Sequence, residues 1–349
     1  MVQVRSVEAL EQVVGSRPLG VMMKSLDALD RHCVRLLALS PFAVVGYADA
    51  EGRARAMAVG GTPGFAKVAG GTLRITLHQP AAVASNVGCG LLFFIPGLGE
   101  TLRVNGRGNV EGDTLIVTVE EAFAHCAKAL LRSSFWAAPP KEPPPAPVPP
   151  LAVSAVQAGP LADPEVLAWI ARTPFVVLTS WDAGGLADAS PKGDPVGFLR
   201  LQGGRLLVPD RPGNRRTDTF HNVIEQPRLA MLALVPGEER ALEISAEGSF
   251  TTEPALLASM AVAGKTPKIA LVLDPKEARL APAPALAAAK LWDASRHVPA
   301  AELPSMAEVF IDHVKQNRQR GAGAAVVRAL ASKRVMGWAL AKDYEKNQY

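Results

Sequence analysis

The chain has 349 residues, with 37 Lys plus Arg against 33 Asp plus Glu and a net charge of +4. This length is typical of two domains, and 48% hydrophobic residues exclude a disordered chain. No apolar run approaches the roughly 18 residues of a membrane span, and the first residues lack the apolar core of a signal peptide. Three widely spaced cysteines indicate neither a disulfide framework nor a zinc knuckle. We therefore expect a cytoplasmic protein with no membrane partner.

The basic residues are scattered along the chain. Their only dense cluster is Arg211, Arg215 and Arg216. Nucleic-acid-binding proteins more often show a stripe of Lys and Arg interleaved with aromatic residues, and aromatics are only 5% here. The composition therefore predicts no nucleic-acid partner.

The first 137 residues read as a helix followed by short strands. Apolar residues at helical spacing predict a helix over 25–39. Strands are predicted at 42–48 and 53–59 around an Asp- and Gly-containing turn, then at 73–77, 90–95 and 101–106. A further strand runs into a helix that ends on Phe135-Trp136.

Residues 138–150 are mostly proline, which predicts a semi-rigid polyproline spacer. The same residues could serve as a recognition peptide for a proline-binding module. We favour the spacer because it separates two similar segments. The predicted domains are therefore 1–137 and 153–349, joined by a linker at 138–152.

The similarity of the two segments indicates an internal duplication. Residues 41–73 align without a gap with residues 174–206, and the shared positions include Pro-Phe, Asp, Gly-Phe and Gly-Gly. The second segment repeats the predicted strands at 175–181, 186–190, 205–208, 229–235 and 241–250. A helical tail over 293–349 is found only after the second segment. Short strands at this spacing predict a mainly β, α+β fold of two tandem antiparallel barrels.

The two repeats differ most where strand meets turn. Residues 209–218 of the second repeat carry three arginines, while the aligned residues 76–85 of the first repeat carry no charge and differ at every position. The turn leads into a predicted helix over 217–226. Guanidinium groups and the amides that open a helix bind phosphate well, so this contrast favours an anion site over a solvated basic turn. Ser190 and Lys192 on the preceding strand are also polar only in the second repeat.

These residues resemble the pyridoxamine 5'-phosphate oxidase-like family of FMN-binding split barrels. The second repeat matches through its 190–198 strand and the turn from Pro209 to Arg216, and the first matches more weakly through 100–106 and 122–130. The resemblance implies two split barrels, the first of them degenerate, and FMN in a groove between barrels. It implies cofactor contacts from seven residues: Ser190, Lys192, Asp210, Arg211, Asn214, Arg215 and Arg216.

The resemblance also implies an FMN-dependent oxidoreductase that passes hydride or electrons between NAD(P)H, or another donor, and a small organic substrate. The alternative is a non-catalytic flavin-binding protein, or a haem-binding or haem-degrading one. A pure interaction protein is a third possibility. His221 follows the arginine turn and is a weaker candidate for approaching a flavin. The catalytic residues stay unassigned, and no metal ligands are predicted.

The contrast between repeats predicts one FMN per chain. Since a family site lies between two barrels, we expect the first repeat to replace a partner subunit in an internal pseudo-dimer. A conventional homodimer, in which second repeats pair with each other, is the competing arrangement.

Overall fold

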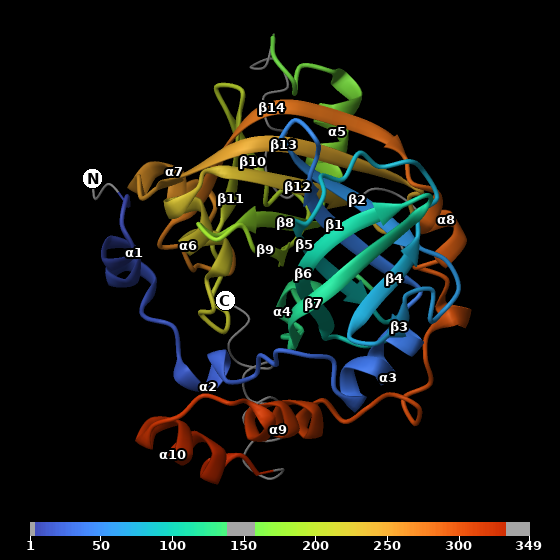
Figure 1. Ribbon diagram of the computed structural model, residues 1–349. Coiled ribbons are helices and arrows are strands. Elements are labelled where there is room, and N and C mark those ends of the chain that lie inside the picture. Colours follow the sequence, from blue (N-terminus) through green and yellow to red (C-terminus); the bar gives the residue numbers. More distant parts are fainter. Residues whose placement is uncertain (1–3, 138–157, 333–349) are drawn as a thin grey trace.

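The computed structural model describes residues 4–137 and 158–332, and it contains two seven-stranded antiparallel sheets that lie against each other (Figure 1). The predicted linker at 138–152 lies outside the described residues. None of the described helices is both long and apolar enough to cross a membrane.

The first repeat supplies one sheet and the helices around it. Its strands are β1 (Phe42–Ala48), β2 (Ala54–Gly60), β3 (Lys67–Ala69), β4 (Thr72–Thr76), β5 (Val87–Phe94), β6 (Thr101–Glu111) and β7 (Thr114–His125). Its helices are α1 (Val7–Val14), α2 (Leu19–Met22), α3 (Arg31–Leu39) and α4 (Lys128–Arg132).

The second repeat supplies the other sheet. Its strands are β8 (Phe175–Trp181), β9 (Ala187–Gly193), β10 (Arg200–Gln202), β11 (Arg205–Pro209), β12 (Arg228–Leu234), β13 (Arg240–Thr251) and β14 (Ala270–Pro282). Its helices are α5 (Pro164–Arg172), α6 (Asp218–Glu225), α7 (Pro254–Ser259), α8 (Pro284–Ala289), α9 (Met306–Gln316) and α10 (Ala322–Leu330).

The two sheets have the same topology, which confirms the duplicated fold. The first has strand order β2-β1-β5-β6-β7-β4-β3, and the second has the corresponding order when read from β9 to β10. The two sheets also share a register shift. It follows Asn105 in the β6–β7 pair of the first repeat and Ser245 in the β13–β14 pair of the second. Each sheet is an open split barrel with flanking helices.

Alternating strand residues serve two different cores. On β1, Ala43 and Val45 point into the core of the first repeat, whereas Phe42 and Val44 point into a core shared by both repeats. Such alternation is the period-two geometry of a strand. The shared core is aromatic at its centre, where the ring of Phe135 lies 4.7 Å from that of Phe175. The internal pairing of repeats expected from the sequence is therefore the arrangement that the structure has.

Glycines bring the two sheets into backbone contact. A Cβ atom on Gly88 would lie 1.9 Å from the carbonyl oxygen of Gly185, and one on Gly46 would lie 2.0 Å from Oγ1 of Thr179. No side chain fits at those distances, so the repeats can approach this closely only because glycine occupies both positions.

The ends of the chain cross between repeats. Leu10 of α1 is buried in the core of the second repeat, whereas Val309 and Phe310 of α9 are buried in the core of the first. In Figure 1, α9 lies below the first repeat, and α10 lies beside it below α2. The tail that follows the second repeat in sequence therefore completes the first. Of the predicted helical tail, residues 333–349 lie outside the described residues.

The predicted helix over 25–39 is wrong in its first turns. Helix α3 begins at Arg31, since the carboxylate of Asp30 caps it by accepting from the backbone N–H groups of His32 and Cys33. Upstream, Leu26 exchanges backbone hydrogen bonds with Ala122 of β7. A local apolar pattern cannot anticipate that pairing with a distant strand.

The close approach at Gly88 predicts a sharp sensitivity to size. Gly88→Ala should lower the free energy of unfolding by about 1–3 kcal/mol, because the methyl group meets rigid backbone of the other repeat. Urea denaturation measures the change. Gly61→Ala is the control, since its Cβ would lie 3.9 Å from the nearest atom, on Phe65. Equal stability of the two variants would contradict the tight contact.

Candidate functional site

A cavity of about 580 Å³ lies between the two repeats. The second repeat lines it with β9 and the loop from β11 to α6. The first repeat contributes Arg103 from β6, His125 at the end of β7, and Cys126, Lys128 and Arg132 around α4. All seven predicted cofactor residues line this cavity: Ser190, Lys192, Asp210, Arg211, Asn214, Arg215 and Arg216.

The cavity is strongly basic. Nine lysines and arginines line it against three aspartates, which are Asp194, Asp210 and Asp218. Excess positive charge inside a concave, partly desolvated wall favours an anionic ligand. Sequence comparison of the repeats finds only part of this charge, because Arg103, Lys128 and Arg132 come from the repeat that lacks the arginine turn.

The loop from β11 to α6 is conformationally strained at the cavity wall. Arg215 and Thr217 both adopt left-handed backbone angles, with φ of 56° and 52°. Such conformations cost about 1–3 kcal/mol each in residues other than glycine, and they gather at ligand sites. Arg215 is exposed and forms no ion pair within residues 4–137 and 158–332. Its guanidinium is therefore available to an anion.

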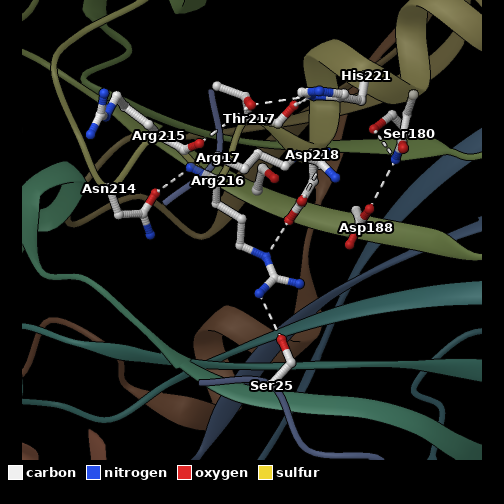
Figure 2. Close-up of polar contacts among 12 residues, drawn as sticks. Arg17, Ser25, Ser180, Asp188, Asn214, Arg215, Arg216, Thr217, Asp218 and His221 are labelled. Carbon is white, nitrogen blue, oxygen red and sulfur yellow. Dashed lines mark hydrogen bonds and ion pairs between the residues drawn. The ribbon is translucent and has the colours of Figure 1, made fainter. Parts of the chain in front are cut away.

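The other two arginines of this loop are already bound to the protein. The buried guanidinium of Arg211 lies 2.6 Å from the carboxylate of Asp194 and donates to the carbonyl of Met260 at 2.8 Å. That of Arg216 lies 2.6 Å from Asp218 and 2.6 Å from Oγ of Ser25, and it also pairs with Glu121. Figure 2 shows Arg216 turned toward Ser25 while Arg215 points elsewhere. Arg211 and Arg216 thus fix the shape of the loop.

The strand side of the cavity carries smaller polar groups. The Nζ atom of Lys192 lies 3.1 Å from the carboxylate of Asp210 and 4.9 Å from the centre of the Phe220 ring. The hydroxyl of Ser190 accepts a hydrogen bond of 2.8 Å from Arg103 of the first repeat. A residue of one repeat therefore orients a predicted cofactor contact of the other. Asn214 accepts from the backbone N–H of Arg216 at 3.0 Å, which shapes the loop.

A buried polar network joins the repeats behind the cavity. Arg103, which is 1% exposed, pairs with Asp218 and lies 3.4 Å from Asp188. Asn105 and Asn222, one from each repeat, both donate to Asp188, at 2.7 and 2.9 Å. Side chains of both repeats thus satisfy one another's charges and hydrogen bonds.

The network moves the pKa values of its two aspartates in opposite directions. Burial, reinforced by neighbouring carboxylates, raises the pKa of Asp188 to about 6 against the opposing charge of Arg103. Burial also disfavours the ionised form of Asp218, but Arg103 and Arg216 outweigh it and hold that pKa at about 2. Asp218 is therefore a fixed negative charge, whereas Asp188 takes up a proton at a higher pH than an ordinary aspartate does.

The cavity also holds a neutral histidine. Burial, aided by the charge of Arg103, lowers the pKa of His125 to about 3. Its Nδ1 atom lies 3.3 Å from the carbonyl of Cys126. His221 does not line this cavity. It is half-buried beside Thr217, facing a separate groove of about 640 Å³ that is rich in acidic residues.

A second cavity occupies the place that corresponds to this one when the two repeats are exchanged, and it is much smaller. There, Met57 and Val59 of β2 line a cavity of only about 120 Å³. Arg103 of the first repeat corresponds to Glu243 of the second, because each lies two residues before the shared register shift. Glu243 pairs with Arg279 at 3.0 Å. Only one of the two related positions therefore has the size and charge of an anion site.

Comparisons with known proteins place the second repeat in a family. Residues 162–282 match the family model of pyridoxamine 5'-phosphate oxidase. The match covers the second repeat, and it supports the family resemblance predicted for that repeat from its sequence. A search of curated proteins finds no match.

Several solved structures are similar to about a third of this chain. HupZ from Group A Streptococcus is 13% identical, covering 32% of this chain and 88% of its own, with a TM-score of 0.28. HutZ, the haem storage protein from Vibrio cholerae, is 15% identical, and the match covers 34% of this chain and 93% of HutZ, with a TM-score of 0.28. An F420 reductase is 15% identical, and the match covers 32% of this chain and 94% of the reductase, with a TM-score of 0.26.

The raised pKa of Asp188 predicts how stability depends on pH. As the pH falls from about 7 to about 4, the folded protein takes up a proton at Asp188 before the unfolded chain does, so this residue favours folding increasingly. The wild-type protein should therefore gain free energy of unfolding relative to Asp188→Asn over this range. Urea denaturation at a series of pH values measures the difference. Parallel pH curves for the two proteins would contradict it.

Proposed function

We propose that the protein is an FMN-dependent oxidoreductase that binds one flavin per chain in the cavity between the repeats. The observation that carries the proposal is a basic cavity of about 580 Å³ at the family motif, closed by side chains of both repeats. Cofactor pockets usually measure about 300–1,000 Å³, so a mononucleotide is an appropriate occupant.

The flavin phosphate would lie at the strained loop. The guanidinium of Arg215 offers a charge-assisted contact, while Arg211 and Arg216 act by holding the loop and its amides in place. Asn214 and Asp210 would stand near the phosphate and the ribityl chain. Ser190 and Lys192 would run beneath the ring system, with the hydroxyl of Ser190 oriented by Arg103.

The bound flavin would supply two-electron redox chemistry between a nicotinamide donor, NAD(P)H or another, and a small organic substrate. The chain's own residues would bind and orient both partners and exclude water. The imidazole of His125 stays neutral because its pKa is lowered, so it can exchange hydrogen bonds with a ligand at the cavity wall. The three free cysteines in the described residues fit a cytoplasmic location.

A haem-binding function is the second candidate, and it rests on His125 and Cys126. A neutral imidazole and a thiol in one cavity wall are groups that ligate haem iron, and basic side chains would suit the propionates. The same arrangement is compatible with a flavin, so the optical spectrum discriminates between the two.

The asymmetry of the two related cavities predicts the stoichiometry. Purified protein should carry one FMN per chain, because the second position measures only about 120 Å³ and presents Glu243 instead of Arg103. Extracted flavin compared with protein concentration gives the ratio. A ratio near two would refute the assignment of a single site, and a Soret band without flavin absorbance would favour haem.

Arg215 is the sharpest test of the phosphate contact, since substitution of Arg216 would also break the buried network. Arg215→Ala removes one charge-assisted contact worth roughly 1.5–3 kcal/mol, so FMN affinity should fall by about tenfold to a hundredfold with an unchanged melting temperature. Fluorescence titration of the apoprotein with FMN measures the affinity. Arg205→Ala, an exposed arginine of β11 outside the cavity, should bind as tightly as the wild type. Unchanged affinity in Arg215→Ala would exclude this phosphate contact.

A further inference from the structure

Three potential metal ligands meet where α3 packs against α9, away from the flavin cavity. Asp30 is the N-cap of α3, Cys33 lies in the first turn of that helix, and His313 lies in the last turn of α9. The side chains of Cys33 and His313 are fully buried, and that of Asp30 is 8% exposed. Their ligand atoms all lie within 4.8 Å of one another.

The distances between these ligand atoms are close to those found around a shared metal ion. Nε2 of His313 lies 3.4 Å from Oδ1 of Asp30 and 3.9 Å from Sγ of Cys33. A good N–H···O bond spans about 2.7–3.2 Å. Zinc bonds of about 2.0–2.3 Å arranged tetrahedrally place neighbouring ligand atoms about 3.3–3.6 Å apart. The distances from Nε2 of His313 to Oδ1 of Asp30 and to Sγ of Cys33 are therefore close to those between ligands of one zinc ion.

The surroundings hold the three side chains in place. The second oxygen of Asp30 accepts a hydrogen bond of 3.0 Å from Gln316, so the carboxylate is oriented by the same helix that carries His313. Outer partners of this kind fix ligand geometry in metal sites. Nδ1 of His313 is buried and has no hydrogen-bond partner within the described residues.

We propose that Asp30, Cys33 and His313 bind one Zn²⁺ ion, which fastens helix α9 to the first repeat. Carboxylate oxygen, thiolate and imidazole are all zinc ligands, and a water molecule can complete four-coordination. On binding, the thiol proton of Cys33 passes to solvent as the zinc–sulfur bond forms. This inference does not depend on the flavin assignment, because none of the three residues lines the cavity.

Cobalt substitution of the full chain tests the site directly. Co²⁺ added to metal-free protein should bind at one ion per chain and give the intense near-ultraviolet band of cobalt–thiolate coordination. Cys33→Ser should abolish that band, and His313→Gln should lower Co²⁺ affinity by at least tenfold. Zn²⁺ should displace the cobalt and raise the melting temperature of the wild type.

Two cysteine variants distinguish this site from metal binding at another thiol of the chain. Cys89→Ala alters another buried thiol and should keep the band. Circular dichroism confirms that each variant folds. Absence of stoichiometric binding by the wild type would overturn the proposal. So would a band that survives Cys33→Ser but is lost in Cys126→Ser, since the metal would then bind in the cavity beside His125.

Discussion

The ion pair between Arg103 and Asp218 is the interaction on which the composite site depends. Both side chains are buried, and each comes from a different repeat. Removal of one partner from such a pair typically costs about 3–5 kcal/mol, because the remaining charge stays desolvated. The same guanidinium also donates to Ser190. The pair therefore couples the docking of the repeats to the shape of the cavity wall.

The two repeats have the same fold but contribute different residues to the two cavities between them, so only one cavity is large and basic. A symmetric pair of barrels would form two equivalent grooves. Here one groove combines a basic loop from the second repeat with Arg103 from the first, while the other measures only about 120 Å³ and carries Glu243. The first repeat lacks the basic loop but forms the opposite wall of the cavity. Its persistence follows from that role, since a single repeat presents only half of the site.

The fold was largely predictable, because it depends on local patterns that occur twice. The alternation of β1 and the Gly-containing turns mark hairpins, and the repeat at 174–206 doubles the evidence for them. The short edge strands β3 and β10 and the full extents of β7 and β14 were not predicted. Strands β3 and β10 have three residues each, too few for an alternating pattern to show, and they pair with the adjacent strands β4 and β11. Strands β7 and β14 extend as far as they do because they also pair with β4 and β11, which are distant from them in sequence.

The second-repeat half of the candidate site was also accessible from sequence, through the contrast between the repeats. The other half was not. Arg103, His125 and Cys126 lie within the runs that carry the first repeat's family resemblance, yet nothing local shows that they face the arginine loop. The binding of Arg211 and Arg216 by buried carboxylates is equally invisible, because it depends on tertiary partners such as Glu121 and Asp194.

The central claim is that the first repeat forms one wall of the cofactor site, and the flavin content of a cavity-filling variant tests it most directly. Cys126 lies on that wall, and Cys126→Trp places a large side chain in the cavity without altering any residue of the second repeat. Our account predicts that this variant purifies folded but without bound flavin, while Cys126→Ala keeps it. Full flavin content in Cys126→Trp would contradict a site shared between the repeats.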